Sequence, residues 1–417
     1  MTIATINPAT VSSNSNESLT FLAHPNDNPV ILWNDLTLAA IVQNLSNNAP
    51  RASYVLALES IAVNDTLSAI NNQPGYLTSL DAPKGISTDA AIAGAAERIL
   101  SHEFPRQSHV FKAELDQSLQ RVPDGPGESQ GVAFGVSVAD TIIGLRANDG
   151  ADRPMPVFLG GTAPGEWRPT PPDFLPGLEP EWGQVRPFAL ESGDQFRPGG
   201  PPALTSPEYA ADFNAVKQLG EIDSEQRTPD QTKAALFWSN DRGSYTTAGH
   251  WNNIATDLLA GQGAGVEDSA HLLTELNVAL ADDFIATWDT KYTYVSWRPI
   301  TAIRQAGEDG NPATSPDPKW NPLLTTPNFP NYVSGHASSG AAAAVVLTDF
   351  FGAIPFSATS PSLPGETRHF NNFTEAAAED GASRVYAGVH FGFSVVTDGA
   401  ALGQNVADTA LASFHTS

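Results

Sequence analysis

The chain of 417 residues contains no cysteine and only two methionines. Without cysteine there can be no disulfide bond, no thiolate metal site and no cysteine nucleophile. The redox compartment in which the protein works also cannot be inferred, because cysteine usage is the usual indicator. Disulfide-stabilised and thiol-dependent classes of protein are therefore excluded.

Basic residues are scarce as well. The sequence has 21 lysines and arginines against 46 aspartates and glutamates, which gives a formal net charge of −25 at pH 7. Nucleic acids and anionic membranes are bound through basic surfaces, so both are poor candidates for partners. A small anion would have to be captured by a local cluster of cations that acts against the field of the whole chain.

Long apolar runs are absent too. Nowhere do about 18 apolar residues follow one another, and the best stretch, residues 341–346, is soon interrupted by Asp349. Residues 1–16 are polar and lack the basic and then apolar arrangement of a signal peptide. We expect a soluble protein, either cytoplasmic or exported by a route without a recognisable signal.

The length exceeds what one hydrophobic core usually supports, so we expect two packed parts or one large helical unit with insertions. The sequence divides into a mobile lead (1–30), an N-terminal helical layer (31–150), an ordered loop (151–204) and a C-terminal helical bundle (205–417). Apolar spacing of three and four residues predicts helices over 32–45, 51–70, 88–101 and 108–121. These helices are interpreted as scaffold.

The loop is distinguished by its composition. Residues 152–202 contain twelve prolines together with six phenylalanines and tryptophans. Flexible linkers are poor in aromatic residues, and long ordered loops are often functional. We therefore expect this loop to be packed against the fold and to line the mouth of a site.

Helical signals resume at Thr228, where Pro229 and Gln231 complete a capping box. A helix predicted over 266–290 has an apolar stripe, with Glu275 and Asp282 off that stripe. This helix ends near Lys291, seven residues before Arg298. If the helix continued, the two cations would lie about 20° apart on one face.

Pro299 disfavours helix at Arg298, so the guanidinium could instead be presented from a turn. Either geometry directs Lys291 and Arg298 toward the same place. Seen alone, such a pair is more often two surface cations.

Two further motifs carry histidines. Ser334, Gly335 and His336 precede a run of small residues, which is typical of a helix N-terminus that binds an anion. Arg384 and His390 are six residues apart, and they converge only if the backbone turns between them, for which Gly388 is suited. Each motif alone has an ordinary structural explanation, but together they predict one oxyanion site.

In this order the motifs K-x6-RP, SGH and SR-x5-H resemble the three-part signature of the vanadium-dependent haloperoxidases and the related acid and lipid phosphatases. Residues 249–252, 287–291 and 375–379 are also similar to bacterial haloperoxidases, so the resemblance covers at least residues 205–400. It implies an all-α fold of two four-helix-bundle-like halves with long Pro/Gly-rich loops. It also implies vanadate as prosthetic group, in a site that phosphate can occupy.

The resemblance assigns a role to each residue of the motifs. His390 would bind vanadium, and His336 would be the acid–base group. The oxyanion would be held by three cations and two hydrogen-bond donors: Lys291, Arg298, Arg384, Ser334 and Gly335. The implied reaction is oxidation of a halide by hydrogen peroxide to hypohalous acid, which then halogenates a small organic acceptor.

Trp288 and Phe329 match the aromatic pair of chloroperoxidases, so the resemblance favours oxidation of chloride and bromide over bromide alone. Two positions depart from the signature. Val333 stands where proline often precedes Ser-Gly-His, a change that the backbone should tolerate. Ser394 stands where an aspartate often follows the second histidine, so we expect another group to orient His390, with Asp398 too distant.

Two alternatives remain open at the level of sequence. In a phosphatase, His390 would form a phosphohistidine and His336 would protonate the leaving group. A catalytically silent relative would only bind an anion, although binding alone would not require both histidines. The sequence leaves open the organic acceptor, and it leaves open whether the chain forms a homo-oligomer.

Overall fold

The computed structural model describes residues 2–5, 20–23, 28–45, 48–241 and 243–415. Helices dominate this part of the chain, as predicted. The α-helices are α1 (Pro29–Asn44), α2 (Ala49–Ile70), α3 (Thr88–Glu103), α4 (Ser108–Leu119), α5 (Pro126–Arg146), α6 (Pro207–Leu219), α7 (Pro229–Phe237), α8 (Thr246–Gln262), α9 (Val266–Tyr294), α10 (Pro299–Arg304), α11 (Gly335–Phe351), α12 (Phe373–Tyr386) and α13 (Asp398–His415).

Two short antiparallel pairs of strands accompany the helices. β1 (Thr2–Thr5) pairs with β2 (Thr20–Ala23), and β3 (Phe356–Thr359) pairs with β4 (Thr367–Phe370). Most of the predicted lead, residues 1–30, lies outside the described residues. None of the described helices is long and apolar enough to cross a membrane.

The chain forms two compact units. The first comprises residues 1–149, 242–278 and 412–417, and the second comprises residues 150–241 and 279–411. All residues of the three sequence motifs belong to the second unit. The predicted helices over 32–45, 51–70, 88–101 and 108–121 correspond to α1 to α4 of the first unit.

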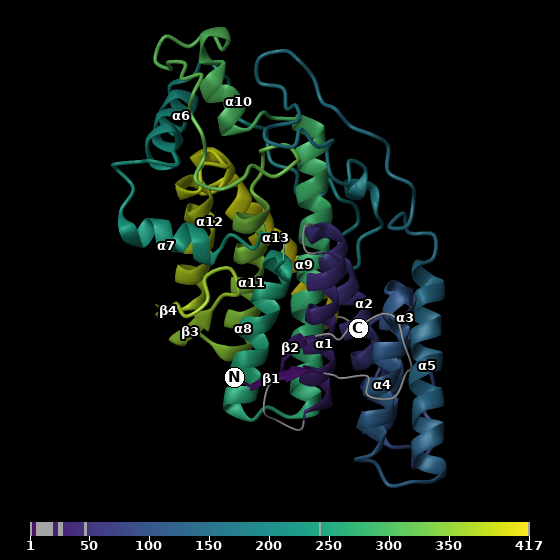
Figure 1. The fold of residues 1–417 in the computed structure, drawn as a ribbon. Coiled ribbons are helices and arrows are strands. Elements are labelled where there is room, and N and C mark those ends of the chain that lie inside the picture. The colour runs from purple at the N-terminus through teal and green to yellow at the C-terminus, as the bar shows by residue number, and fades with distance from the viewer. Residues whose placement is uncertain (1, 6–19, 24–27, 46–47, 242, 416–417) are drawn as a thin grey trace, which may run out of the picture. The chain divides into compact units, whose positions relative to one another are not determined.

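In the first unit, α3 and α5 lie side by side (Figure 1). Their contact depends on small residues, because a Cβ added to Gly135 of α5 would lie 2.0 Å from the carbonyl oxygen of Ala91. A Cβ at Gly94 of α3 would likewise lie 2.6 Å from the carbonyl oxygen of Val132. The alanine-rich pattern that predicted α3 therefore reflects close helix packing.

In the second unit, α11 packs against α12 (Figure 1). Glycine, alanine and serine fill most of the first half of α11, and such small residues let neighbouring backbones approach closely. An apolar cavity of about 660 Å³ lies between α11, α12 and α13, and Ala337, Gly381 and Val395 are among the residues that line it. The residues of the three sequence motifs do not line this cavity.

The long proline-rich loop is fixed to the C-terminal half of α9. Asp282 accepts hydrogen bonds from the backbone N–H groups of Phe188 (2.7 Å), Ala189 (2.7 Å) and Leu190 (2.9 Å). Arg197 makes a bidentate ion pair with Asp289, with distances of 2.6 and 2.8 Å. Asp282 and Glu275, which the sequence pattern placed off the apolar stripe, are both buried.

Candidate active site

Lys291 lies in the last turn of α9 with no exposed surface. Its ammonium group donates hydrogen bonds to the carbonyl oxygens of Pro330 (3.0 Å) and Asn331 (3.2 Å), and to that of Val333. Burial lowers the pKa of Lys291 well below its ordinary value, and the positive charge of Arg298 lowers it further. The three carbonyl oxygens match the three hydrogens of an ammonium group, so a charged Lys291 would act on the site through its charge while its hydrogens are held by the main chain.

Arg298 follows a break in the helix. α9 ends at Tyr294, Val295 has a positive φ of 47°, and Arg298 itself is extended before Pro299 begins α10. The prediction of a turn at Arg298 is confirmed, and the alternative of one continuous helical face is wrong.

The turn buries the guanidinium of Arg298 completely. Nε donates to the carbonyl oxygen of Phe329 (2.8 Å) and Nη1 to that of Val389 (2.8 Å). Burial lowers the pKa of Arg298 to about 9, with a further contribution from the charge of Arg384. Nη2 is buried and has no partner among the described residues.

Ser334 is the N-cap of α11, as its position before a run of small residues predicted. Its hydroxyl accepts a hydrogen bond from the N–H of Ala337 (3.4 Å). In the described structure the N–H groups of Gly335 and His336 have no backbone or side-chain acceptor. Free N–H groups in the first turn are the feature with which helices bind anions.

His336 is partly exposed, whereas the other residues to which the three motifs assign a role are buried. Its Nε2 is buried and has no hydrogen-bond partner in the described part of the chain. Burial lowers the pKa of His336 well below 6.5, and so does the charge of Arg384, whereas the carbonyl groups of Ser239 and Trp238 act in the opposite direction. The lowered pKa favours the neutral form of the imidazole.

Arg384 lies in the last turn of α12, and the turn that follows returns the chain toward it. Gly388 has a φ of 78°, and the N–H groups of Val389 (3.1 Å) and His390 (3.2 Å) donate to the carbonyl oxygen of Arg384. The predicted turn at Gly388 is thus confirmed. It brings His390 close to Arg384 although the two are six residues apart.

Both ring nitrogens of His390 have partners. Nε2 lies 2.9 Å from Nη1 of Arg298, and Nδ1 lies 3.2 Å from the hydroxyl of Ser394. Because Ser394 donates its own hydrogen to the carbonyl oxygen of Phe391 (2.9 Å), its oxygen accepts from Nδ1–H. Nε2 then carries the lone pair on the side of the cations.

This arrangement corrects an expectation about the position of Ser394. The sequence suggested that a group other than Ser394 would orient His390, but Ser394 does so itself. Asp398 instead accepts a hydrogen bond from the hydroxyl of Tyr332 (2.8 Å). The pKa of His390 is lowered by burial and by the charges of four neighbours, Arg298, Lys291, Arg384 and His336.

These residues form one group, which we call the oxyanion cluster: Lys291, Arg298, Ser334, Gly335, His336, Arg384 and His390. In the described part of the chain, none of its three cations lies within 4 Å of a carboxylate oxygen. Buried charges are normally paired, because an unpaired charge in the interior is costly. The cluster therefore has the charge and the unused donors that a bound oxyanion requires.

Vanadate and phosphate both fit this donor set. Arg298 Nη2, Arg384 Nε and His336 Nε2 are buried without partners among the described residues. A tetrahedral or five-coordinate oxyanion offers several acceptor oxygens. The lone pair on His390 Nε2, which accepts from Nη1 of Arg298 here, could bind the central atom once Nη1 turns from Nε2 to an oxygen of the oxyanion. Lys291, Arg298 and Arg384 would supply the balancing charge.

Trp288 and Phe329 lie beside the cluster. Their ring centroids are 4.9 Å apart, and Nζ of Lys291 lies 5.8 Å from the Trp288 ring and 5.0 Å from the Phe329 ring. The loop contributes here too, because the indole N–H of Trp288 donates to the carbonyl oxygen of Leu178 (3.1 Å). The two aromatic residues of the proposed halide pocket are thus adjacent to each other and to a cation.

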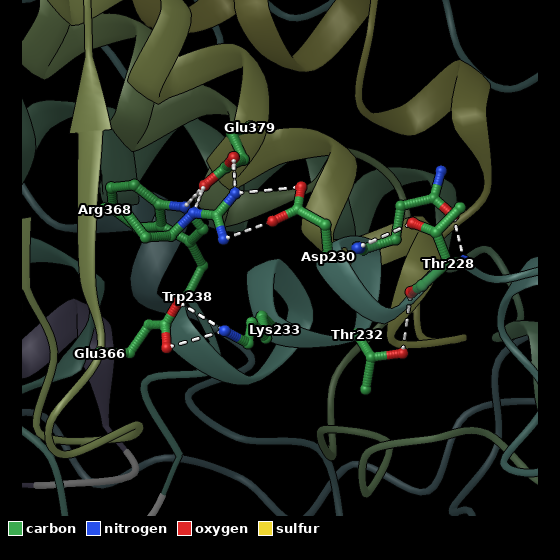
Figure 2. A network of polar contacts seen from close by, with 9 residues as sticks. Thr228, Asp230, Thr232, Lys233, Trp238, Glu366, Arg368 and Glu379 are labelled. Carbon is green, nitrogen blue, oxygen red and sulfur yellow. Dashed lines mark hydrogen bonds and ion pairs between the residues drawn. The ribbon is translucent and has the colours of Figure 1, made fainter.

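A polar network that the sequence did not reveal supports one side of the cluster. Figure 2 shows Arg368 of β4 between Glu379 of α12 and Asp230 of α7, with distances of 2.5 to 3.4 Å. Glu379 also accepts a hydrogen bond from the indole of Trp238 (2.9 Å). The carbonyl oxygen of Trp238 lies 3.5 Å from Nη1 of Arg384, so the network positions a main-chain group of the site.

Two acidic residues near the cluster were also missed. Loss of contact with water raises the pKa of Asp241, and the nearby charge of Arg384 opposes this. Asp283 accepts a hydrogen bond from the hydroxyl of Ser338, and burial raises its pKa to about 8. Asp283 lies eight residues before Lys291, a spacing that places both on one face of a helix, so the sequence could have indicated that Asp283 lies near the site. Asp241 lies in a loop, where no such spacing applies.

The structure is that of an all-α protein with a buried cluster of three cations and two histidines. Residues 271–417 match the family model of the VCPO second helical-bundle domain. Among curated proteins, the chain is similar to the vanadium chloroperoxidase of Curvularia inaequalis. The two are 24% identical over 490 residues, which cover 88% of this chain and 79% of that protein.

Solved structures give the same result. The first bacterial vanadium-dependent iodoperoxidase is similar with a TM-score of 0.81 and 27% identity, over 93% of this chain and 97% of that chain. A holo-type bacterial vanadium-dependent chloroperoxidase is similar with a TM-score of 0.73 and 18% identity, over 94% and 96%. By these comparisons the chain is similar, in sequence and in fold, to vanadium-dependent haloperoxidases.

Proposed function

We propose that this protein is a vanadate-dependent haloperoxidase that uses hydrogen peroxide to oxidise chloride or bromide, and that the hypohalous acid halogenates small organic acceptors. The observation that carries the proposal is the oxyanion cluster, in which three buried cations, none within 4 Å of a carboxylate oxygen of the described residues, lie near the imidazole of His390. The similarity to vanadium chloroperoxidase supports the choice of vanadate over other oxyanions.

When bound, vanadate would supply a Lewis-acidic centre that activates hydrogen peroxide toward a halide. His390 would hold it through Nε2, and the hydroxyl of Ser394 would keep the proton on Nδ1. Lys291, Arg298 and Arg384 would balance its charge, while Ser334 and the N–H of Gly335 would orient its oxygens. His336, whose Nε2 is unpartnered in the described structure, would accept the proton of the incoming peroxide.

The preference for chloride and bromide rests on Trp288 and Phe329. Their rings exclude water from the space beside Lys291, and a less hydrated site strengthens the interaction between a cation and a developing negative charge. Since one structural relative is an iodoperoxidase, the halide order has to be measured. We expect chloride, bromide and iodide all to be oxidised.

The test compares two activities of one preparation. The purified protein is assayed for bromination of a phenolic dye with hydrogen peroxide, with and without added vanadate, and then for release of phosphate from a phosphomonoester. The proposal predicts vanadate-dependent bromination and little phosphate release. Phosphate release without bromination would show a phosphatase, and the absence of both would show a protein that only binds an anion.

A further inference from the structure

One face of α9 carries three polar residues at four-residue spacing. Asp283, Thr287 and Lys291 are all completely buried, and all three lie next to the segment that carries the head of α11. Asp283 contacts Ser338, and Lys291 contacts the carbonyl oxygens of residues 330, 331 and 333. Thr287, the middle residue of the three, has no role in the proposed function.

The hydroxyl of Thr287 is unused in the described structure. Threonines in helices usually donate to the carbonyl oxygen four residues earlier, as Thr290 of the same helix does to Ala286 at 2.9 Å. Thr274, also in α9, does the same to Ala270 at 2.7 Å. Thr287 Oγ1 is buried with no partner among the described residues, although leaving a buried hydroxyl unbonded costs free energy.

The position of Thr287 explains what the hydroxyl could bind. A Cβ built on Gly335 would lie 3.4 Å from the ring of Phe284, 3.9 Å from Cγ2 of Thr287 and 3.9 Å from the ring of Trp288. Thr287 therefore lies against the residue whose unpartnered N–H belongs to the oxyanion cluster. The two aromatic neighbours contribute no hydrogen-bond donor on this side.

The cluster also needs another donor here. All three hydrogens of the Lys291 ammonium group are directed at main-chain carbonyl oxygens, so Lys291 stabilises an anion through its charge. An oxygen bound next to Gly335 would otherwise receive a single hydrogen bond on this side, from the backbone. A neutral hydroxyl that is already desolvated adds a second donor at little further cost.

We propose that Thr287 is an oxyanion-binding residue, whose hydroxyl donates to the same oxygen as the N–H of Gly335. The inference extends the oxyanion site on which the proposed function depends, but it holds equally for phosphate and for vanadate. It can therefore be tested without any measurement of halide oxidation.

The test uses isothermal titration calorimetry of the purified protein with inorganic phosphate and, separately, with orthovanadate. Thr287→Val removes the hydroxyl and keeps the shape, so both affinities should fall about tenfold, the effect expected for one hydrogen bond to a charged group. Thr287→Ser keeps the hydroxyl and should restore binding to within about threefold of the wild type.

Thr290→Val is the matched control. It removes a buried threonine hydroxyl from the same helix, but one that is already bonded to the backbone, and the affinities should not change. If Thr287→Val binds phosphate and vanadate like the wild type, the inference is wrong. If that variant does not fold, a crystal structure of the wild type with phosphate decides, because a distance above about 4 Å from Oγ1 to every phosphate oxygen would refute it.

The outcome is independent of the proposed function. A wild type without haloperoxidase activity would refute the function, yet the Thr287 variants could still lose affinity for phosphate. Conversely, an active haloperoxidase whose anion affinity is insensitive to Thr287→Val would refute only the inference.

Discussion

His336 and His390 have low pKa values for the same reasons, burial and nearby cations, but their ring nitrogens differ in what they contact. Those of His390 are held by Arg298 and Ser394, whereas Nε2 of His336 has no partner among the described residues. The hydroxyl of Ser394 keeps the hydrogen on Nδ1 of His390 and so directs Nε2 at the cations, as a ligand requires, whereas a nitrogen without a partner suits a group that must exchange a proton. The division of roles proposed for the two histidines therefore follows from their contacts.

Replacing His336 with alanine tests this division. Because a positioned acid–base group typically contributes a factor of about 10² to 10⁴, we expect turnover of bromide to fall by that amount. Affinity for orthovanadate, measured by titration calorimetry, should change by less than about tenfold. His369→Ala, which alters an exposed histidine of β4, is the control. Loss of both properties, or of neither, would contradict the role given to His336.

Glu59 of α2, in the first unit, is a buried acid that the active site does not use. It is 2% exposed, its Oε1 has no partner among the described residues, and burial raises its pKa from 4.5 to about 8. Between these two values the unfolded chain has lost the proton while the native state keeps it. Raising the pH through this range therefore favours unfolding.

The measurement is urea unfolding between about pH 5 and about pH 8. This one group should lower the free energy of unfolding by up to about 1.4 kcal/mol for each pH unit in that window. Glu59→Gln should flatten this dependence, and Glu225→Gln, at an exposed position, should leave it unchanged. Equal slopes for the wild type and Glu59→Gln would show that Glu59 is ionised in the native state.

At the scale of elements, the turn after α12 decides whether the cluster can form. Gly388 has a φ of 78°, and an added Cβ would lie 2.4 Å from the carbonyl oxygen of Gly220 and 2.9 Å from Cβ of Pro322. Both the backbone conformation and the close packing therefore require glycine. The turn is what returns His390 to Arg384.

Gly388→Ala should consequently affect stability and the site together. Gly365→Ala is a matched control, because Gly365 has a similar φ of 85° but no atom near an added Cβ. The left-handed conformation alone should cost each variant about 1 to 2 kcal/mol in urea unfolding. Only Gly388→Ala should lose more than this and also bind phosphate more weakly. Equal losses of stability and unchanged binding would mean that the turn accommodates the side chain.

The helices were predictable wherever local chemistry determines them. Thr228 and Gln231 form the predicted capping box, and Arg298 is non-helical before Pro299 as expected. The end of α9 at Tyr294 was not predictable, because it depends on the positive φ of Val295, which its side chain does not favour. In the site, the motif residues could be identified from their order. The contacts of Trp238 with Glu379 and Arg384, and of Asp283 with Ser338, join residues that are distant in sequence. The contact of Ser394 with His390 depends on the local fold after α12.

At the scale of the whole molecule, a chain of net charge −25 holds three cations in its interior. The net negative charge repels small anions at long range, whereas the cluster attracts them at short range. Salt weakens the long-range repulsion more than the contacts inside the site, because exposed charges are screened and buried ones are not.

The rate of anion binding should therefore rise with ionic strength. Stopped-flow measurements of vanadate binding should show an increase of severalfold between about 0.01 M and about 0.15 M, where the Debye length falls from about 30 Å to about 8 Å. The added salt should have a large organic anion that does not fit the site. A rate that falls with added salt would show that a local positive field extends into solution.

The contacts of Lys291 also bear on how the proposed activity could be lost. Its ammonium group binds the main chain on both sides of Tyr332, so a neutral residue there would leave three carbonyl oxygens without a donor. The same segment carries Phe329 at one end and Ser334 at the other. We expect an inactive descendant with this fold to retain Lys291, because the lysine holds the main chain, and to have lost His336. The presence of this lysine in a related sequence is therefore weak evidence of haloperoxidase activity.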